Sequence, residues 1–166
     1  MAEPDESGVY LPGLPDLGET GLVIYTAGYF KQIKGIGYTA WAWFYDDPDE
    51  QAMVKHAELH AWGDAWGYPS ERMAELEAID RAIVETADAQ KRFNEVTIRC
   101  QSELIVRSLL GTWDVRSPVV KEKIQQIQSR LQGKELILEL ISAKANIMCL
   151  SLCDKVIQER ASEYPF

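Results

Sequence analysis

Two carboxylates at helical positions, Glu75 and Asp154, are the residues of this sequence whose placement suggests chemistry. Glu75 stands one turn before Ile79 and two turns before Ile83, so its side chain falls in line with an apolar, core-facing stripe. That position is unusual for a solvated charge, and carboxylate oxygens are the ligands that Mg²⁺ takes in proteins. A structural role is the alternative, because the helix dipole stabilises a glutamate near a helix start.

Asp154 follows Ser151 by three residues, and the pattern Ser-x-x-Asp resembles a capping box. The pattern predicts a closing helix that begins at Ser151, in which Asp154 satisfies the first turn. A purely structural role is therefore sufficient to explain this carboxylate.

The three cysteines do not form a metal site or a disulfide framework. Cys100, Cys149 and Cys153 are odd in number, and none belongs to a Cys-x-x-Cys pair or stands beside a histidine. Three buried thiols are the expected outcome.

The composition limits the classes of function. A chain of 166 residues with 46% hydrophobic residues is long enough for one core, and its net charge of −9 opposes bulk binding of phosphodiesters. Any nucleic-acid contact would have to be local. No apolar run approaches about 18 residues and the N-terminus has no basic start, so we expect no membrane span or signal peptide and a cytoplasmic or nuclear location.

The first part of the chain predicts an antiparallel meander. Residues 1–20 are acidic and rich in proline and glycine, which is typical of a flexible leader, and residues 21–166 form the predicted domain. Strands are predicted at 22–26, 38–45 and 52–63.

Beyond residue 70 the pattern has helical periods that alternate with short apolar runs. Helices are predicted at 71–89 with Ser70 as N-cap, 102–110, 118–133 and 151–163, strands at 96–100 and 135–141, and a loop at 144–150. The order β-β-β-α-β-α-α-β-α predicts an α/β domain, in which a five-stranded mixed sheet carries helices on both faces.

This order and several short motifs resemble the ribonuclease H fold. In that family the first strand ends in a metal-binding Asp-Gly, the first helix carries an Arg-Met-x-Glu-Leu-like run, the fourth strand ends in Asp-Ser, and the last helix carries an aspartate. The corresponding stretches here are Thr26-Ala27-Gly28, Arg72-Met73-Ala74-Glu75-Leu76, Gln101-Ser102 and Cys153-Asp154.

The sequence departs from the family at the catalytic positions. Ala27 and Gln101 replace two metal-binding aspartates, and Lys144 stands where the family has a loop histidine. The resemblance leaves Glu75 and Asp154 as remnant catalytic carboxylates and implies weak metal binding by them at best. Two Mg²⁺ ions are held by a cluster of negative charge, and this cluster is reduced from about −4 to −2.

The resemblance also gives Ser70 a second interpretation, because the family places a phosphate-binding hydroxyl there. The N-cap role is sufficient without it.

Aromatic and basic side chains could also contact nucleic acid. Stacking on bases is possible for four tryptophans, but core packing is the favoured explanation: Trp41, Trp43, Trp62 and Trp66. A further set of residues could line one edge of the sheet or could lie on solvated faces: Lys31, Lys34, Lys121, Lys123 and Lys144.

The leading hypothesis is a catalytically inactive ribonuclease H-like domain, a pseudoenzyme that binds nucleic acid or protein as a scaffold and has no cofactor. The alternative is an active endoribonuclease that cleaves RNA in RNA/DNA hybrids with Mg²⁺ or Mn²⁺, using relocated ligands such as Glu77, Asp80 or Glu103. A protein-interaction domain with no nucleic-acid role is a third possibility, compatible with the acidity.

Overall fold

The computed structural model describes residues 21–47, 51–60, 71–93, 95–112, 115–132 and 136–163, so the predicted leader at 1–20 lies outside the described residues. Three strands form the expected antiparallel meander: β1 is Gly21–Ile33, β2 is Ile36–Asp47 and β3 is Ala52–His60. β1 continues past its predicted end because it stays paired with β2 up to the turn at Lys34 and Gly35. Both turn residues have positive φ, at 53° and 81°, which suits a tight hairpin.

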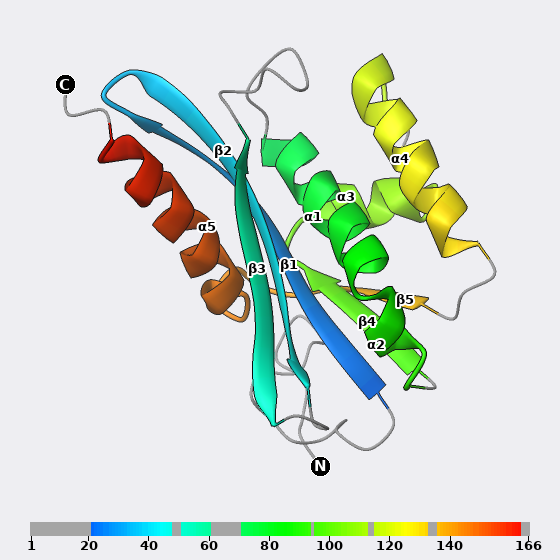
Figure 1. Cartoon of the computed structure of the whole chain (residues 1–166). Helices are drawn as coiled ribbons and strands as arrows, with labels where there is room; N and C mark the ends of the chain where they lie inside the picture. Colours follow the sequence, from blue (N-terminus) through cyan, green and yellow to red (C-terminus); the bar gives the residue numbers. More distant parts are fainter. Residues whose placement is uncertain are drawn as a thin grey trace.

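Two parallel strands complete the sheet: β4 is Glu95–Cys100 and β5 is Leu136–Leu140. β4 lies beside β1 and β5 lies beside β4, which gives the strand order β3-β2-β1-β4-β5 (Figure 1). The predicted mixed five-stranded sheet is therefore confirmed. β1 is its middle strand, and β3 and β5 are its edges.

Helices cover both faces of the sheet, as predicted (Figure 1). One face carries α1, Glu71–Glu85, with α3, Glu103–Leu109, and α4, Pro118–Leu131, while α5, Ile147–Ala161, covers the opposite face. The α1 side encloses a core that includes Leu76 and Ile79, and the α5 side encloses a core that includes Cys149 and Ile157. No helix in the described part of the chain is long and apolar enough to cross a membrane.

The predicted helix at 71–89 is divided at Thr86, and a short helix α2, Ala87–Gln90, follows. The buried Thr86 hydroxyl donates to the carbonyl of Ala82, and the Gln90 side chain donates to the carbonyl of Ile83 at 2.8 Å. Side chains that bond to carbonyls of the preceding turn compete with the helical ladder, which explains the break.

The closing helix begins four residues earlier than predicted, so the prediction of a loop at 144–150 and of a helix start at Ser151 is wrong in part. Asn146 is the N-cap residue, and its side chain makes no capping hydrogen bond. The apolar run from Ile147 is helical because it brings the fully buried Cys149 against the sheet. Asp154 therefore lies in the helix interior, and the capping-box interpretation of Ser151 and Asp154 is wrong.

A buried network of charges joins α1 to α4. Lys123 of α4 lies 2.7 Å from Glu77 Oε2 and 2.8 Å from Asp80 Oδ2. Arg130 pairs with the other oxygen of Asp80, and Arg81 pairs with the other oxygen of Glu77. Burial raises the pKa of Glu77, but hydrogen bonds from Lys123 and Arg81 more than offset this effect, so the pKa is lowered and the carboxylate stays charged.

Candidate functional site

Ala27 and Gln101, the two positions where the resemblance leads us to expect aspartates, come close together because β1 and β4 are adjacent parallel strands. The register pairs Tyr25 with Arg99. The chain continues two residues beyond this pair to Ala27 on β1 and to Gln101 just after β4. The strand order therefore brings these two positions to one region of the sheet, as the sequence predicted.

Asn146, which the sequence analysis did not select, connects these positions. Its Nδ2 donates to the carbonyl of Thr26 at 2.8 Å and to Gln101 Oε1 at 3.1 Å. Asn146 is fully buried, and its Oδ1 has no hydrogen-bond partner among the described residues. No local signal identifies this residue, because its partners lie 120 and 45 residues away in the sequence.

Glu75 reaches the same region from α1. The backbone of α1 at Glu75 lies directly against Gly28 of β1, and the buried Glu75 Oε2 has no hydrogen-bond partner in the part of the chain that the structure describes. Burial raises the pKa of Glu75 to about 7, although a hydrogen bond from Ser102 acts to lower it. Near neutral pH a substantial fraction of this carboxyl is therefore protonated.

Asp154 reaches the region from α5, where the neighbouring Cys153 thiol donates to the carbonyl of Ala27 at 3.5 Å. Asp154 Oδ1 accepts a hydrogen bond from the Lys31 ammonium at 3.0 Å, and both side chains are partly exposed. The negative charge of Asp154 is thus matched by a cation of the protein itself.

Contacts of neighbouring residues therefore connect the segments that carry these positions: Gly28 lies against the Glu75 backbone, Asn146 bonds to Gln101, and Cys153 bonds to Ala27. The meeting of the Glu75 and Asp154 side chains in one cleft and their catalytic and metal-binding roles stay predictions. Ser70, with its N-cap and phosphate-binding interpretations, lies outside the described residues.

The residues considered as relocated ligands are engaged elsewhere. Glu77 and Asp80 belong to the α1–α4 charge network, where their oxygens contact cationic side chains. Glu103 is exposed on α3 and pairs with Arg107 at 2.9 Å. Each of these three carboxylates therefore already has a cationic partner within the protein.

The side chains at this site do not fit a pair of Mg²⁺ ions. Ala27 supplies no ligand, Gln101 Oε1 accepts from Asn146, and Asp154 is paired with Lys31. Within the described residues, no group of three or more His, Cys, Asp or Glu side chains could hold a metal ion. Two hard divalent cations require several oxygen ligands and compensating negative charge, which these side chains do not provide.

The structure also tests the predictions made for the tryptophans and the cysteines. Trp41 and Trp43 are buried, and the Trp43 indole donates to Glu85 at 3.1 Å, so core packing is confirmed for both. Trp62 and Trp66 lie outside the described residues. The three cysteines are buried free thiols, as expected.

The five lysines do not line one edge of the sheet. Lys31 and Lys34 belong to the β1–β2 hairpin, whereas Lys121 and Lys123 lie on α4, which packs against α1. Lys31 and Lys123 are engaged in ion pairs, and Lys144 precedes α5. The structure therefore does not support the alternative of a shared basic edge.

Comparison with solved structures identifies the fold. No family model matches the sequence, and a search of curated protein sequences gives no match. RNase H1 from the halophilic archaeon Halobacterium salinarum is similar with a TM-score of 0.67 and 19% identity, over 84% of this chain and 98% of that chain. An RNase H1 isolated from compost by a metagenomic approach has a TM-score of 0.69 and 23% identity, over 86% and 99% of the two chains.

An N-terminal RNase H domain from Mycobacterium tuberculosis is also similar, with a TM-score of 0.65 and 14% identity, over 86% of this chain and 98% of that chain. The chain therefore has a ribonuclease H-like fold, as its motifs indicated. Likeness at such low identity establishes the fold, and the activity has to be argued from the site.

Proposed function

We propose that this chain is a catalytically inactive ribonuclease H-like domain that acts by binding nucleic acid or protein. The observation that carries the proposal is which residues occupy the four positions where the ribonuclease H family has metal-binding carboxylates. Two are Ala27 and Gln101, and a third, Asp154, is paired with Lys31. The other remaining carboxylate, Glu75, has no ion pair within the described residues that matches the one between Asp154 and Lys31, and burial favours its neutral form.

The chemistry of phosphodiester hydrolysis explains why this arrangement favours binding over catalysis. Two-metal hydrolysis needs ions that stabilise both the attacking and the leaving oxygen. A glutamine offers one neutral oxygen where a carboxylate offers an anion, and alanine offers none. The remaining groups therefore give little support to a pair of divalent ions.

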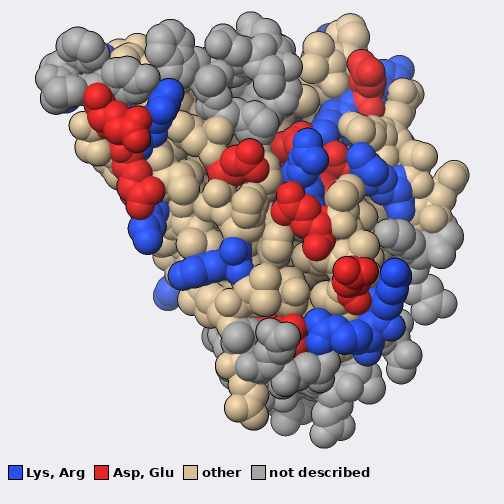
Figure 2. Space-filling view, in the orientation of Figure 1, with Lys and Arg blue, Asp and Glu red and all other residues tan. Residues whose placement is uncertain are grey.

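Similar proteins suggest one class of partner. The compost RNase H1 and a foamy viral protease-reverse transcriptase have both been solved in complex with an RNA/DNA hybrid. Figure 2 shows Lys and Arg side chains interspersed with Asp and Glu side chains over one face of this chain. With a net charge of −9, binding of a hybrid would depend on local contacts and would weaken steeply with salt.

The purified chain should not cleave an RNA/DNA hybrid above background in millimolar Mg²⁺ or Mn²⁺, because two of the four ligands are absent. The measurement is gel analysis of an end-labelled hybrid, with an active ribonuclease H as positive control. Metal-dependent cleavage that disappears in Glu75→Ala would contradict the proposal and show that other carboxylates complete the site.

Restoring both aspartates, as Ala27→Asp with Gln101→Asp, should make the stability of the chain depend on Mg²⁺. The clustered carboxylates repel one another in metal-free buffer, so the variant should melt below the parent. At a Mg²⁺ concentration tenfold above Kd, binding adds about 1.4 kcal/mol, or roughly 4 °C in Tm for a chain of this size.

Thermal melts of the parent and the variant, with and without Mg²⁺, measure this effect. The matched control is Ala27→Asn with Gln101→Asn, which adds similar volume without charge and should not respond. Equal Mg²⁺-induced shifts in the parent and the aspartate variant would show either that the parent already binds metal or that the inferred pocket does not exist.

A further inference from the structure

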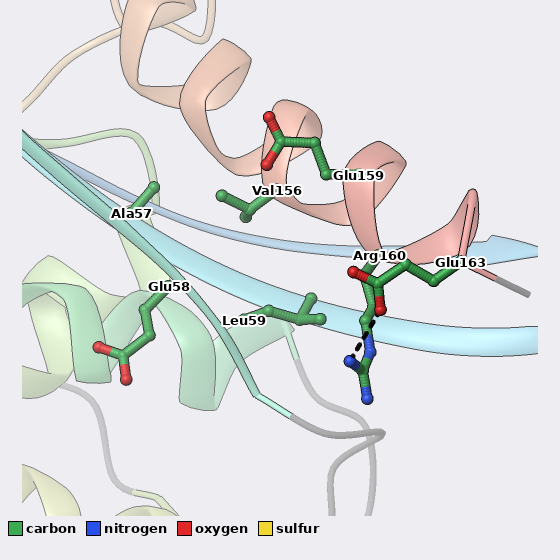
Figure 3. A pocket seen from close by; sticks show the side chains of 7 residues that line it. All are labelled: Ala57, Glu58, Leu59, Val156, Glu159, Arg160 and Glu163. Atoms are coloured by element: carbon green, nitrogen blue, oxygen red, sulfur yellow. Dashed lines mark hydrogen bonds and ion pairs between the residues drawn. The ribbon is translucent and has the colours of Figure 1, made fainter.

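A shallow groove of about 460 Å³ lies between the edge strand β3 and α5 (Figure 3). Ala57 and Leu59 of β3 and Val156 of α5 form its apolar surface. All three side chains pack against the core under α5 but remain half-exposed. The groove therefore offers apolar surface that a ligand could cover.

Acidic side chains border this apolar surface. Glu159 and Glu163 are exposed at the α5 side, and Glu58 lies on β3. Arg160 pairs with Glu163 at 3.1 Å. Three carboxylates and one guanidinium leave an excess of negative charge, which complements a basic ligand.

The strand beside the groove has an open edge. β3 pairs with β2 on one side and is the last strand of the sheet, so within the described residues its other edge has no strand partner. On such an edge alternate backbone N–H and C=O groups point outward, where they can form hydrogen bonds with an added strand.

We propose that the β3–α5 groove binds an extended segment of a partner protein that carries both apolar residues and Lys or Arg on the face turned toward α5. The segment adds to β3 as a further strand, its apolar side chains contact Leu59 and Val156, and its cations pair with Glu159 and Glu163. This inference rests on the proposed binding function and names its partner. A second copy of the chain is disfavoured because it brings the same acidic rim and another net charge of −9.

The test uses the full chain and a fluorescein-labelled peptide of about ten residues, in which Val and Lys take turns at every second position with Ser between them, a length suited to one strand. Fluorescence anisotropy should show binding of this peptide, and weaker binding when Ser replaces each Val or Glu replaces each Lys. Hydrogen exchange should show new protection of backbone amides within 57–59. Protection confined to other elements would overturn the proposal.

Reversing the rim charges with Glu159→Lys and Glu163→Lys should weaken peptide binding roughly tenfold or more. The matched control, Asp88→Lys with Glu122→Lys, changes the net charge equally at exposed positions of α2 and α4 and should retain most of the affinity. Equal losses in the two variants would mean non-specific attraction and would overturn the proposal.

Two further measurements distinguish a failure of the groove assignment from a failure of the proposed loss of catalysis. Sedimentation that shows a dimer of the parent, abolished by the Glu159 and Glu163 reversal, would assign the groove to a second copy and overturn the assignment to a partner segment. Hybrid cleavage would overturn the proposed loss of catalysis. An inactive chain that does not bind the Val-Lys peptide would overturn the groove assignment alone.

Discussion

Replacing Glu75 with glutamine should stabilise the protein by about 3 kcal/mol at pH 8 and leave its stability at pH 4 nearly unchanged. The reason is the cost of holding a charged carboxylate in a buried position. Burial raises the pKa of Glu75 from 4.5 to about 7, and each unit of difference corresponds to about 1.4 kcal/mol. Glutamine has nearly the same shape and carries no charge.

The direction of the pH dependence follows from proton binding. Below pH 4.5 the Glu75 carboxyl is protonated in both the unfolded and the folded state. Its favourable contribution to the free energy of unfolding is therefore fully present. Between the two pKa values the folded state holds the proton more tightly. The contribution is therefore lost as the pH rises through about 7, where the buried group becomes charged.

Urea unfolding of the parent and Glu75→Gln from pH 4 to pH 8 measures this effect, and the difference between their free energies of unfolding should grow with pH. Glu122→Gln, an exposed position on α4, is the control and should follow the parent. A difference that stays constant across this range would show that Glu75 is solvated in the folded state. Glu75 would then be charged at neutral pH in the folded protein.

The sheet and its two helical layers could be predicted because their signals are local. The apolar run of the first strand, the alternation along the second and the period of Leu76, Ile79 and Ile83 depend on near neighbours, and the structure follows them. The start of α5 could not be predicted in this way. Asn146 bonds to distant strand residues instead of capping the helix, so the sequence around it carries no start signal.

The candidate site could likewise be predicted only where its features are visible in the local sequence. Ala27 and Gln101 can be read directly from the motifs, since an absent ligand is visible in the sequence. The pairing of Lys31 with Asp154 joins residues 123 positions apart and depends on the packing of α5 on β1. The raised pKa of Glu75 depends on burial, which the helical stripe suggested but could not measure.

Substituting alanine for Gly28 should disrupt folding, with a cost of at least about 4 kcal/mol, because α1 lies directly against this residue. A Cβ atom at Gly28 would meet the backbone of Ala74 and Glu75, including the Glu75 Cα at 2.6 Å. Backbone atoms of a packed helix cannot move alone, so the whole of α1 would have to shift away from β1. The glycine that follows the lost aspartate position is therefore required by the fold itself, whether or not the site is catalytic.

Thermal and urea unfolding of Gly28→Ala tests this argument, with Gly35→Ala as the matched control. Gly35 lies in the hairpin turn with φ of +81° and no atom within 4 Å of an added Cβ, so its substitution should cost only about 1 kcal/mol through backbone strain. A Gly28→Ala protein as stable as the Gly35→Ala protein would mean that α1 and β1 are farther apart in solution. In that case Glu75 would also lie farther from Ala27, and the assembly of the site would have to be reconsidered.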